Sequence, residues 1–343
     1  MPIDSIRDVD HLEELLSEPS PAAIDAVANV DGDFIVLGVG GKMGPTLARM
    51  LRRAVDAAGI NRRVIGVSRF STPELPEQLR QHGVEPISCD LLDGDALNKL
   101  PEIKNVIYMA GMKFGTTGQQ ARTWAMNSFL PGLVAQKFRH SRLVAFSTGN
   151  VYPMVPLHTG GCTEEVDPAP NGEYGMSCLG RERIFEHFSR SLNIPMAIIR
   201  LNFAVEMRYG VIVDMATQIY NDQPIDLCMG NLNAIWQSDA NAMTIAALSH
   251  VSTPPLILNL TGPEILSVRA ICQELGTHLG KPPKFVGSET GVAFLANAQK
   301  CMELFGYPRI PPRQIVQWTA DWLTRGGKTL GKPTHFETRD GKY

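Results

Sequence analysis

The segment GEYGMSC, from Gly172 to Cys178, contains the side chain in this sequence that is the clearest candidate for taking part in a reaction. A tyrosine such as Tyr174 can act as a general acid or base when a nearby positive charge lowers its pKa, yet the residue one helical turn further on is the uncharged Cys178. Tyr174 is therefore either a catalytic residue with an unusual neighbour or an ordinary packed tyrosine. A thiol near a helix N-terminus can itself be a nucleophile, but a cysteine on an inward helix face is more often a small buried apolar residue.

A glycine-rich loop early in the chain predicts a phosphate-binding turn. In FIVLGVGGKMGPTLARML, the glycines Gly38, Gly41 and Gly44 have the spacing G-x-x-G-x-x-G and lie between an apolar run and a helical pattern. Glycines allow a tight turn and a close approach of the backbone to a pyrophosphate, which the free N–H groups of the following helix then hold. The pattern predicts dinucleotide binding, and the alternative is a glycine-rich turn without a ligand.

The end of the second apolar run bears on which dinucleotide is bound. A fold that selects NAD usually has a carboxylate there to hold the ribose 2′-hydroxyl. This chain has VIGVSRF, which places Ser68 and Arg69 at that position. A hydroxyl and a cation suit a 2′-phosphate, so NADP is favoured as the cofactor and NAD is the alternative. Arg69 would otherwise stack on the adenine or remain a solvated surface residue.

The elements that must position these residues form an alternating pattern. Apolar runs of about six residues, FIVLGVG, RVIGVSR, NVIYMAG, RLVAFST and PMAIIRLN, are separated by helical patterns. Continuous β-branched runs of this kind are typical of buried parallel strands in βαβ units. The sequence therefore predicts an α/β fold of the Rossmann type, a doubly wound parallel sheet.

The chain divides into four predicted segments. Residues 1–31 are expected to form a helical N-terminal extension packed on the main domain, and residues 32–205 the dinucleotide-binding domain. After residue 205 the alternation of apolar runs and helical patterns becomes less regular, so residues 206–330 are interpreted as a smaller substrate domain. A strand or helix is expected to be exchanged between the two domains. Residues 331–343 are polar and contain early Gly and Pro, which predicts an extended surface tail.

Composition excludes several classes of function. The 343 residues are 44% hydrophobic and 20% charged, with a formal net charge of −3, as in an ordinary globular protein without the basic surface that nucleic acid requires. The six cysteines form no C-x-x-C pair, which argues against disulfides and zinc and favours a reducing compartment. The acidic N-terminus and the absence of a long apolar run argue against a signal peptide and a membrane span. We expect a cytoplasmic protein with a small-molecule substrate and without a metal, nucleic-acid or membrane partner.

The motifs occur in an order that resembles the extended short-chain dehydrogenase/reductase family, also called the NAD-dependent epimerase/dehydratase family. CDLLD, with Asp90 and Leu91, resembles the segment that contacts adenine. VIYMAGMKFG, with Ala110, Gly111 and Lys113, resembles the fourth-strand segment of the UDP-galactose 4-epimerases in that family, where the lysine lies beside the nicotinamide ribose. The resemblance extends from about residue 34 to residue 325.

Later motifs continue the resemblance and supply the remaining site residues. Asn127 in MNSFLPGLVAQ matches a cofactor-binding position, and STGNVYP places Thr148 at the catalytic hydroxyl position with Ser147 beside it. The acidic and proline-containing loop that follows leads to Tyr174, the expected acid/base. In the family a lysine stands where this chain has Cys178. Arg200, Asn202 and Asp239 match positions in the later substrate-domain motifs.

The missing lysine has a calculable cost. A positive charge about 5 Å from a tyrosinate, at an effective dielectric constant near 20, stabilises it by roughly 3 kcal/mol, on the order of two pKa units. Tyr174, Cys178 and Arg181 share one helix face, so the Arg181 side chain can reach part of the way back. The resemblance places Lys113 near the same point. Lys113 or Arg181 is therefore the candidate source of catalytic positive charge.

The resemblance implies an NAD(P)-dependent oxidoreductase, epimerase or dehydratase that acts on a sugar or other polyhydroxylated small molecule. The alternative is a dinucleotide-binding sensor or scaffold without turnover. The resemblance also implies a homodimer that forms through the helices of residues 121–139 and 174–191.

Other side chains carry weaker signals. His158 follows the serine–threonine strand and could donate a proton, and one of Glu164 and Glu165 is expected to face the site. Arg208 and Tyr209 are candidates for reading a substrate anion or hydroxyl.

Overall fold

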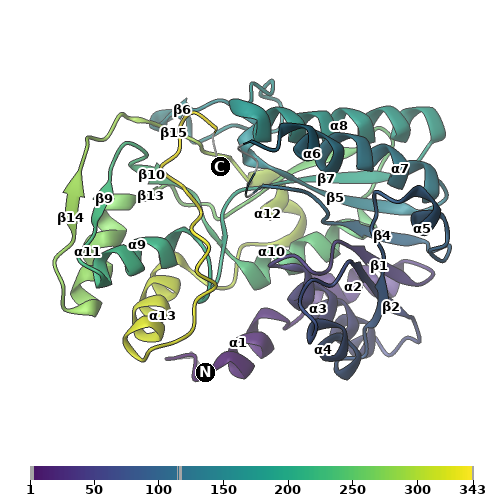
Figure 1. The fold of residues 1–343 in the computed structure, drawn as a ribbon, viewed down its shortest axis with the longest axis horizontal. Coiled ribbons are helices and arrows are strands. Elements are labelled where there is room, and N and C mark those ends of the chain that lie inside the picture. Colours follow the sequence, from purple (N-terminus) through teal and green to yellow (C-terminus); the bar gives the residue numbers. More distant parts are fainter. Residues whose placement is uncertain (1–3, 114, 116–117, 342–343) are drawn as a thin grey trace.

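The apolar runs of the sequence form one parallel sheet. The structure is a computed structural model that describes residues 4–113, 115 and 118–341. Within these residues the main sheet has seven strands in the order β12-β7-β5-β4-β1-β2-β3, and every neighbouring pair is parallel (Figure 1). The strands are β1 (Phe34–Leu37), β2 (Val64–Ser68), β3 (Glu85–Ser88), β4 (Asn105–Tyr108), β5 (Arg142–Thr148), β7 (Met196–Leu201) and β12 (Leu256–Leu260). The predicted α/β fold of the Rossmann type is confirmed.

Helices cover both faces of this sheet. One face carries α5 (Gly94–Asn98), α6 (Gln120–Trp124), the π-turn η1 (Ala125–Phe129), α7 (Leu130–Lys137) and α8 (Gly172–Leu192). The other face carries α2 (Pro21–Asn29), α3 (Gly44–Ala57), α4 (Leu75–Gln81), α10 (Gln237–Ala246), the 3-10 turn η4 (Ala247–Ser249) and α12 (Gln299–Phe305). Alternate strand residues point to opposite faces, so Ile107 and Val144 join one core cluster while Val106 and Leu143 join the other.

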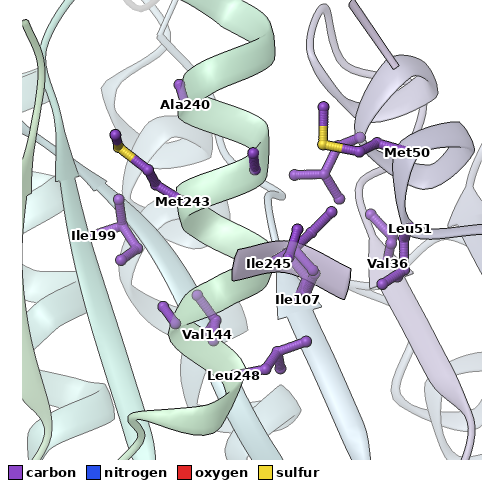
Figure 2. Packing of buried hydrophobic residues seen from close by; sticks show 14 of the residues in the cluster. Val36, Met50, Leu51, Ile107, Val144, Ile199, Ala240, Met243, Ile245 and Leu248 are labelled. Atoms are coloured by element: carbon purple, nitrogen blue, oxygen red, sulfur yellow. The ribbon is translucent and has the colours of Figure 1, made fainter. Parts of the chain in front are cut away.

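Helix α10 lies directly on the sheet although it belongs to the predicted substrate domain. Ala240, Met243 and Ile245 face Ile199 and the neighbouring strands (Figure 2). Every residue of α10 is buried, because α2 and α3 cover its outer side. A helix surrounded in this way must be apolar or hydrogen-bonded on all sides. Its polar side chains meet this condition through partners on other elements: Gln237 and Asn241 donate to Thr46 Oγ1, and Asp239 pairs with Arg309. The chain after residue 206 thus returns to the sheet three times, through α10, β12 and α12.

A second core forms beside the sheet. Its helices are α9 (Val211–Tyr220), α11 (Val268–Leu279) and α13 (Pro312–Thr324), and Trp236 and Trp318 meet edge to face with ring centroids 5.5 Å apart. Short strands pair in twos nearby: β6 (Val155–Pro156) with β15 (Val292–Ala293), β8 (Ala204–Val205) with β11 (Ile235–Trp236), β9 (Pro224–Asp226) with β14 (Lys284–Val286), and β10 (Asn231–Leu232) with β13 (Leu266–Ser267). The 3-10 turns η2 (Gly149–Val151) and η3 (Leu157–Thr159) follow β5.

The N-terminal helices divide between the two cores. Helix α2 packs on α3 and α10 beside the sheet, whereas α1 (Val9–Leu16) inserts Leu12 and Leu16 into the second core. These two leucines are four residues apart and therefore lie on one face of the helix. The extension consequently joins the two halves of the molecule.

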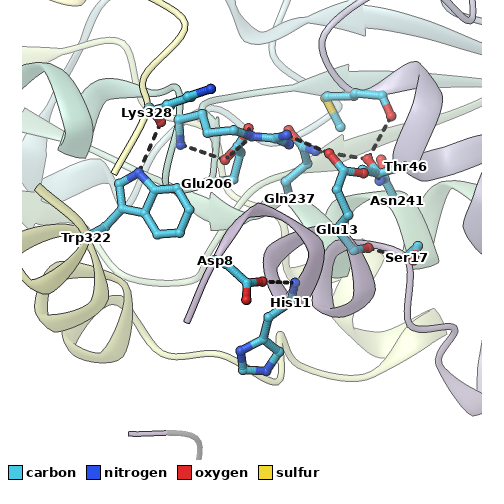
Figure 3. A network of polar contacts seen from close by, with 12 residues as sticks. Asp8, His11, Glu13, Ser17, Thr46, Glu206, Gln237, Asn241, Trp322 and Lys328 are labelled. Carbon is cyan, nitrogen blue, oxygen red and sulfur yellow. Dashed lines mark hydrogen bonds and ion pairs between the residues drawn. The ribbon is translucent and has the colours of Figure 1, made fainter. Parts of the chain in front are cut away.

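Polar contacts around α1 strengthen this link (Figure 3). Asp8 caps the helix by accepting the N–H of His11 at 2.8 Å. Glu13 pairs with Arg208 at 2.6 Å, and Arg208 also pairs with the buried Glu206 at 2.9 Å. The sequence suggested Arg208 as a reader of a substrate anion, but its guanidinium is held by these two carboxylates.

The C-terminal tail crosses the molecule between the two halves, where Figure 1 shows it as the yellow segment that ends near β6. Residues 331–341 have little regular structure, yet Thr334 and Phe336 are buried. The segment is extended, as expected, but not all of it lies on the surface, because the ring of Phe336 packs in the second core. Among the residues that the structure describes, no helix has both the length and the apolar character to cross a membrane.

The contact between α10 and the sheet predicts a large effect of one substitution. Replacing Ile245 with alanine should lower the free energy of unfolding by about 3 kcal/mol, because a fully buried side chain would leave a cavity against the strands. Urea unfolding followed by tryptophan fluorescence measures this change. The control is Leu304→Ala in α12, whose side chain is 39% exposed and should cost less than about 1 kcal/mol. Equal effects in the two variants would contradict the assignment of α10 to the core.

Candidate active site

A cleft of about 350 Å³ opens at the carboxyl ends of the central strands. Strand order reverses between β1 and β4, and in open α/β sheets ligands bind at such a reversal. Four predicted parts of the site meet in the cleft: the glycine loop, the segment after β4, the end of β5 and the start of α8. The residues that line it from these parts are Gly38, Gly41, Gly44, Gly111, Lys113, Ser147, Thr148 and Tyr174. The turn after β7 contributes Asn202 and Phe203, and the second half of the molecule contributes Tyr209, Gly210 and Thr334.

The glycine loop is closely packed at two of its three glycines. Gly38 has φ +91°, and a Cβ there would lie 2.7 Å from the backbone nitrogen of Ala110. A Cβ on Gly44 would lie 2.3 Å from the carbonyl oxygen of Val39. The nearest neighbour of a Cβ on Gly41 would be 3.4 Å away, so this glycine leaves space on the cleft side. Helix α3 begins at Gly44, which places the free N–H groups of its first turn at the loop.

Tyr174 lies at the cleft wall in the first turn of α8. Its hydroxyl is hydrogen-bonded to the side chains of Thr148 and Cys178. Burial raises the pKa of Tyr174 well above its ordinary value, and Cys178 adds to this, while the positive charge of Arg181 opposes it. At neutral pH Tyr174 is therefore a neutral phenol that can donate a proton.

Cys178 is fully buried in a small apolar cluster with Val151, Tyr152 and Cys162. Burial raises the pKa of its thiol, so the sulfur is protonated at neutral pH. These surroundings are those of a packing residue and do not activate a nucleophile.

Arg181 places a buried cation beneath the cleft. Its guanidinium donates to the carbonyl of Phe146 at 2.8 Å and to Oδ1 of Asn127 at 2.7 Å. A Cβ on Gly111 would lie 2.4 Å from the Arg181 guanidinium, so the group sits directly under that glycine. Its charge acts on Tyr174 through the protein interior. By contrast, Arg183 points outward and pairs with Glu186 at 3.0 Å.

Asn127 lies behind the cleft wall and not at its surface. It is fully buried in the π-turn η1. Its amide accepts the N–H of Met112 at 2.8 Å and donates to the Met112 carbonyl at 2.9 Å and to Ser177 Oγ at 3.0 Å. The side chain fixes the segment that carries Gly111 and Lys113, and its contact with a cofactor stays a prediction.

Lys113 is the second cation beside Tyr174. Its ammonium lies 5.8 Å from the centroid of the Tyr174 ring and 6.0 Å from that of Phe203. Burial lowers the pKa of Lys113 to about 8, while Cys178 and Asp214 act in the opposite direction. The two candidate cations thus flank the tyrosine, Lys113 within the cleft and Arg181 beneath it.

The residues predicted for the adenosine half lie at the ends of β2, β3 and β4, next to the glycine loop. Ser68 lies directly against the glycine loop, since a Cβ added to Gly40 would be 2.5 Å from the Ser68 Oγ. The exposed guanidinium of Arg69 lies 3.9 Å from the carboxylate of Asp90. Leu91 and Ala110 are buried nearby. Arg69 therefore has an acidic neighbour that the sequence motif did not reveal.

Sequence reasoning missed a third cation in the cleft. The ammonium of Lys42 lies 3.3 Å from the centroid of the Tyr209 ring, which links the glycine loop to the second half of the molecule. Burial lowers the pKa of Lys42 to about 7, and the charges of Lys113 and Lys332 add to this. Its place between two glycines of the motif was an available signal.

A buried ion pair behind the cleft was also missed. Ser147 Oγ donates to Glu182 Oε1 at 2.5 Å, and Glu182 pairs with Arg200 at 2.8 Å. Arg200 in turn donates to the Tyr152 hydroxyl at 2.6 Å. This network holds the end of β5, which carries Thr148.

The weaker candidates lie elsewhere. His158 is exposed in η3, and Glu165 is exposed in the loop that follows. Glu164 accepts the backbone N–H of Asn259 at 2.8 Å. Asp239 pairs with Arg309 at 2.9 Å in a structural contact. The described ranges contain no group of three or more His, Cys, Asp or Glu side chains arranged to hold a metal ion.

Several solved structures share this fold. UDP-glucuronic acid 4-epimerase from Bacillus cereus, in complex with NAD and a fluorinated UDP-glucuronic acid, is 20% identical with a TM-score of 0.72, over 85% of this chain and 99% of that protein. dTDP-glucose 4,6-dehydratase from Bacillus anthracis, in complex with NAD, is 17% identical with a TM-score of 0.72, over 86% and 97%. UDP-glucose 4-epimerase from Thermotoga maritima, with UDP-glucose, is 16% identical with a TM-score of 0.68, over 86% and 99%. At these identities the likeness is one of fold.

Sequence comparison identifies the family. No curated protein matches the chain in sequence. The profile of the NAD dependent epimerase/dehydratase family matches residues 34–250, from β1 past the end of α10. Because this match covers more than half of the chain and includes the glycine loop, Thr148 and Tyr174, the protein belongs to the NAD dependent epimerase/dehydratase family.

Proposed function

We propose that the protein is an NAD(P)-dependent oxidoreductase, epimerase or dehydratase that acts on a sugar nucleotide or a related polyhydroxylated molecule. One observation carries the proposal: the hydrogen-bonded pair of Tyr174 and Thr148 faces the glycine loop across a single cleft, with Lys113 beside the tyrosine. Solved structures of the same fold support it, because the Bacillus cereus epimerase is in complex with NAD and a UDP-sugar, and the Thermotoga maritima epimerase is in complex with UDP-glucose.

The glycine loop fits a dinucleotide. Side chains at Gly38 and Gly44 would collide with the backbone, and Gly41 leaves open space toward the cleft. The N-terminus of α3 and the ammonium of Lys42 would hold the negative charge of a pyrophosphate. A bound nicotinamide would supply hydride exchange with the substrate.

The residues of the chain have separate tasks in this scheme. Thr148 orients the reacting oxygen of the substrate, and Tyr174 donates or accepts its proton. When Tyr174 gives up its proton, Lys113 and Arg181 stabilise the resulting phenolate from two sides. Lys113 and Arg181 thereby supply the positive charge that a lysine at position 178 would otherwise provide.

The alternative function is a dinucleotide-binding sensor without turnover. The raised pKa of Tyr174 and the apolar surroundings of Cys178 favour it. The Cys178→Lys variant separates the two cases, since only a silent protein would gain oxidoreductase activity from a cation at this point.

Lys113 should control the rate and its dependence on pH. Lys113→Met should lower kcat/KM about a hundredfold at neutral pH, the effect of roughly two pKa units on Tyr174. The charge of Lys113 is present at low pH and is lost as pH rises through about 8, so wild-type kcat/KM should fall there. Lys113→Arg stays charged and should keep activity while losing that fall. Steady-state assays with a panel of UDP-sugars and both cofactors measure these values.

Two outcomes would count against this assignment. If Lys113→Met matched the wild type at neutral pH, Lys113 would have no part in the reaction. If Tyr174→Phe retained full turnover, Tyr174 would not be the acid/base. A Tyr174→Phe variant that binds cofactor normally but is inactive is the expected result.

The preference for NADP is proposed from Arg69. Arg69→Ala should weaken NADP binding about tenfold and change NAD binding less than about twofold, because only NADP presents a 2′-phosphate to the guanidinium. Asp90→Asn is the complementary variant, since it removes the carboxylate 3.9 Å from Arg69 and should tighten NADP binding. Fluorescence titrations with NADPH and NADH measure both. Equal losses for the two cofactors in Arg69→Ala would contradict a contact with the 2′-phosphate and would indicate that Arg69 stacks on the adenine that both share.

A homodimer is proposed from an exposed apolar surface on α6, η1 and α8. Trp124, Phe129 and Met176 are 38%, 61% and 49% exposed on these adjacent helices. Arg183 and Glu186, of opposite charge, lie further along α8. A two-fold interface pairs a surface with itself, and an apolar centre with charges of both signs at its edge suits a second copy of the chain.

A substitution that introduces one charged side chain tests this interface. Phe129→Glu should convert a dimer to a monomer, because it would bury a carboxylate in the apolar centre. Size-exclusion chromatography with light scattering measures the mass. Tyr307→Glu is the control, since its side chain is 72% exposed on another part of the molecule and should leave the mass unchanged. A wild-type protein that is already monomeric would overturn the proposal.

A further inference from the structure

The C-terminal residues 331–341 form a shared wall of the cavities around the active site. Thr334 lines the cleft that contains Tyr174 and Thr148. Lys332 lines a second cavity, of about 880 Å³, on the other side of the glycine loop. The segment passes between the two halves of the molecule in Figure 1. One short segment of the chain therefore borders both cavities.

The first part of the segment is fixed to the second core. The N–H and hydroxyl of Thr334 donate to Asp214 Oδ2 at 2.7 and 2.5 Å. Phe336 is buried among the side chains of the second core. The guanidinium of Arg339 donates to the carbonyl of Cys228 at 2.6 Å and to Thr290 Oγ1 at 2.7 Å.

The end of the segment contacts the start of the helix that carries Tyr174. Asn171 Nδ2 donates to the carbonyl of Arg339 at 2.7 Å. Gly341 has φ +74° and lies directly on this turn, since a Cβ there would be 2.8 Å from Gly172 Cα. Asn171 is the N-cap residue of α8, but its side chain is directed to the tail. Removing that side chain therefore weakens the contact with the tail by one hydrogen bond and leaves the helix bonds intact.

We propose that residues 331–341 are a strap that closes the active-site cleft and opens at Asn171. The contacts of Thr334 and Phe336 fix the start of the strap to the second half of the molecule, so only its end, which includes Arg339, moves away when the contact at Asn171 breaks. The proposal rests on the proposed function for the identity of the ligand, a nicotinamide dinucleotide that enters when the strap is open.

The test compares two matched substitutions in the full-length protein. Asn171→Ala removes the hydrogen bond to the tail, and Asn29→Ala removes an amide-to-carbonyl bond of the same type within α2, 2.8 Å long, away from the cleft. Trypsin cleavage after Arg339, followed by intact mass spectrometry without ligand, reports opening of the strap. Stopped-flow fluorescence with NADPH and NADH reports ligand entry.

Asn171→Ala should be cleaved about fivefold faster than the wild type, the effect of one hydrogen bond, and should bind NADPH or NADH with a faster association rate. Asn29→Ala should match the wild type in both measurements. Cleavage at sites outside the tail reports global unfolding and should be the same in all three proteins.

Wild-type cleavage kinetics in Asn171→Ala would overturn the strap. Faster cleavage with an unchanged association rate would overturn its role in ligand entry. The proposed function fails separately, if an equilibrium titration shows that the wild type binds neither dinucleotide. The comparison of cleavage rates without ligand still decides whether the strap opens at Asn171.

Discussion

The parallel sheet must be covered on both faces, and much of the structure follows from that constraint. Its central strands are apolar on both sides, so an exposed face of these strands would cost hydrophobic free energy. The chain meets this requirement with segments that are distant in sequence: α2 from the N-terminal extension, and α10, β12 and α12 from the region after residue 206. Because all strands run in one direction, their carboxyl ends meet at one edge, where Gly38, Lys113, Thr148 and Tyr174 come together.

In the proposed active site the positive charge lies away from position 178. Position 178 carries a thiol that is buried in apolar surroundings, and such surroundings would penalise an ammonium. The positive charge lies instead in the guanidinium of Arg181, fixed by Asn127 and the Phe146 carbonyl, and in the ammonium of Lys113. A guanidinium suits the buried position because its planar fork is satisfied by two fixed acceptors, whereas Lys113 remains at the cleft wall.

Two terminal segments connect the halves that enclose the cleft. Helix α1 inserts leucines into the second core and pairs Glu13 with Arg208, while the tail ties Asp214 and the start of α8 to one stretch of chain. Both segments lie beside the glycine loop, where they line the larger cavity through residues such as Glu14 and Lys332. The cavities beside the glycine loop are therefore lined by both terminal segments as well as by the domain cores.

Much of the fold and part of the site could be predicted from the sequence, because they depend on local patterns. The apolar runs, the spacing of Gly38 and Gly44, and the face shared by Tyr174, Cys178 and Arg181 are properties of neighbouring residues. The family and the α/β fold followed from them and are confirmed. The roles of the individual site residues stay predictions.

Only the tertiary structure decided which distant side chains meet. Arg208 was suggested as a substrate contact, yet it pairs with Glu13, 195 residues away in the chain. Thr334 belongs to a polar tail that predicted a surface segment, yet it reaches the cleft through Asp214, 120 residues away. The sequence by itself determined the elements and the chemistry they carry, whereas the packing of remote segments determined which groups are neutralised, which are buried and which face the cleft. The physical reason is that hydrogen bonds, ion pairs and burial depend on distances in space that local periodicity does not encode.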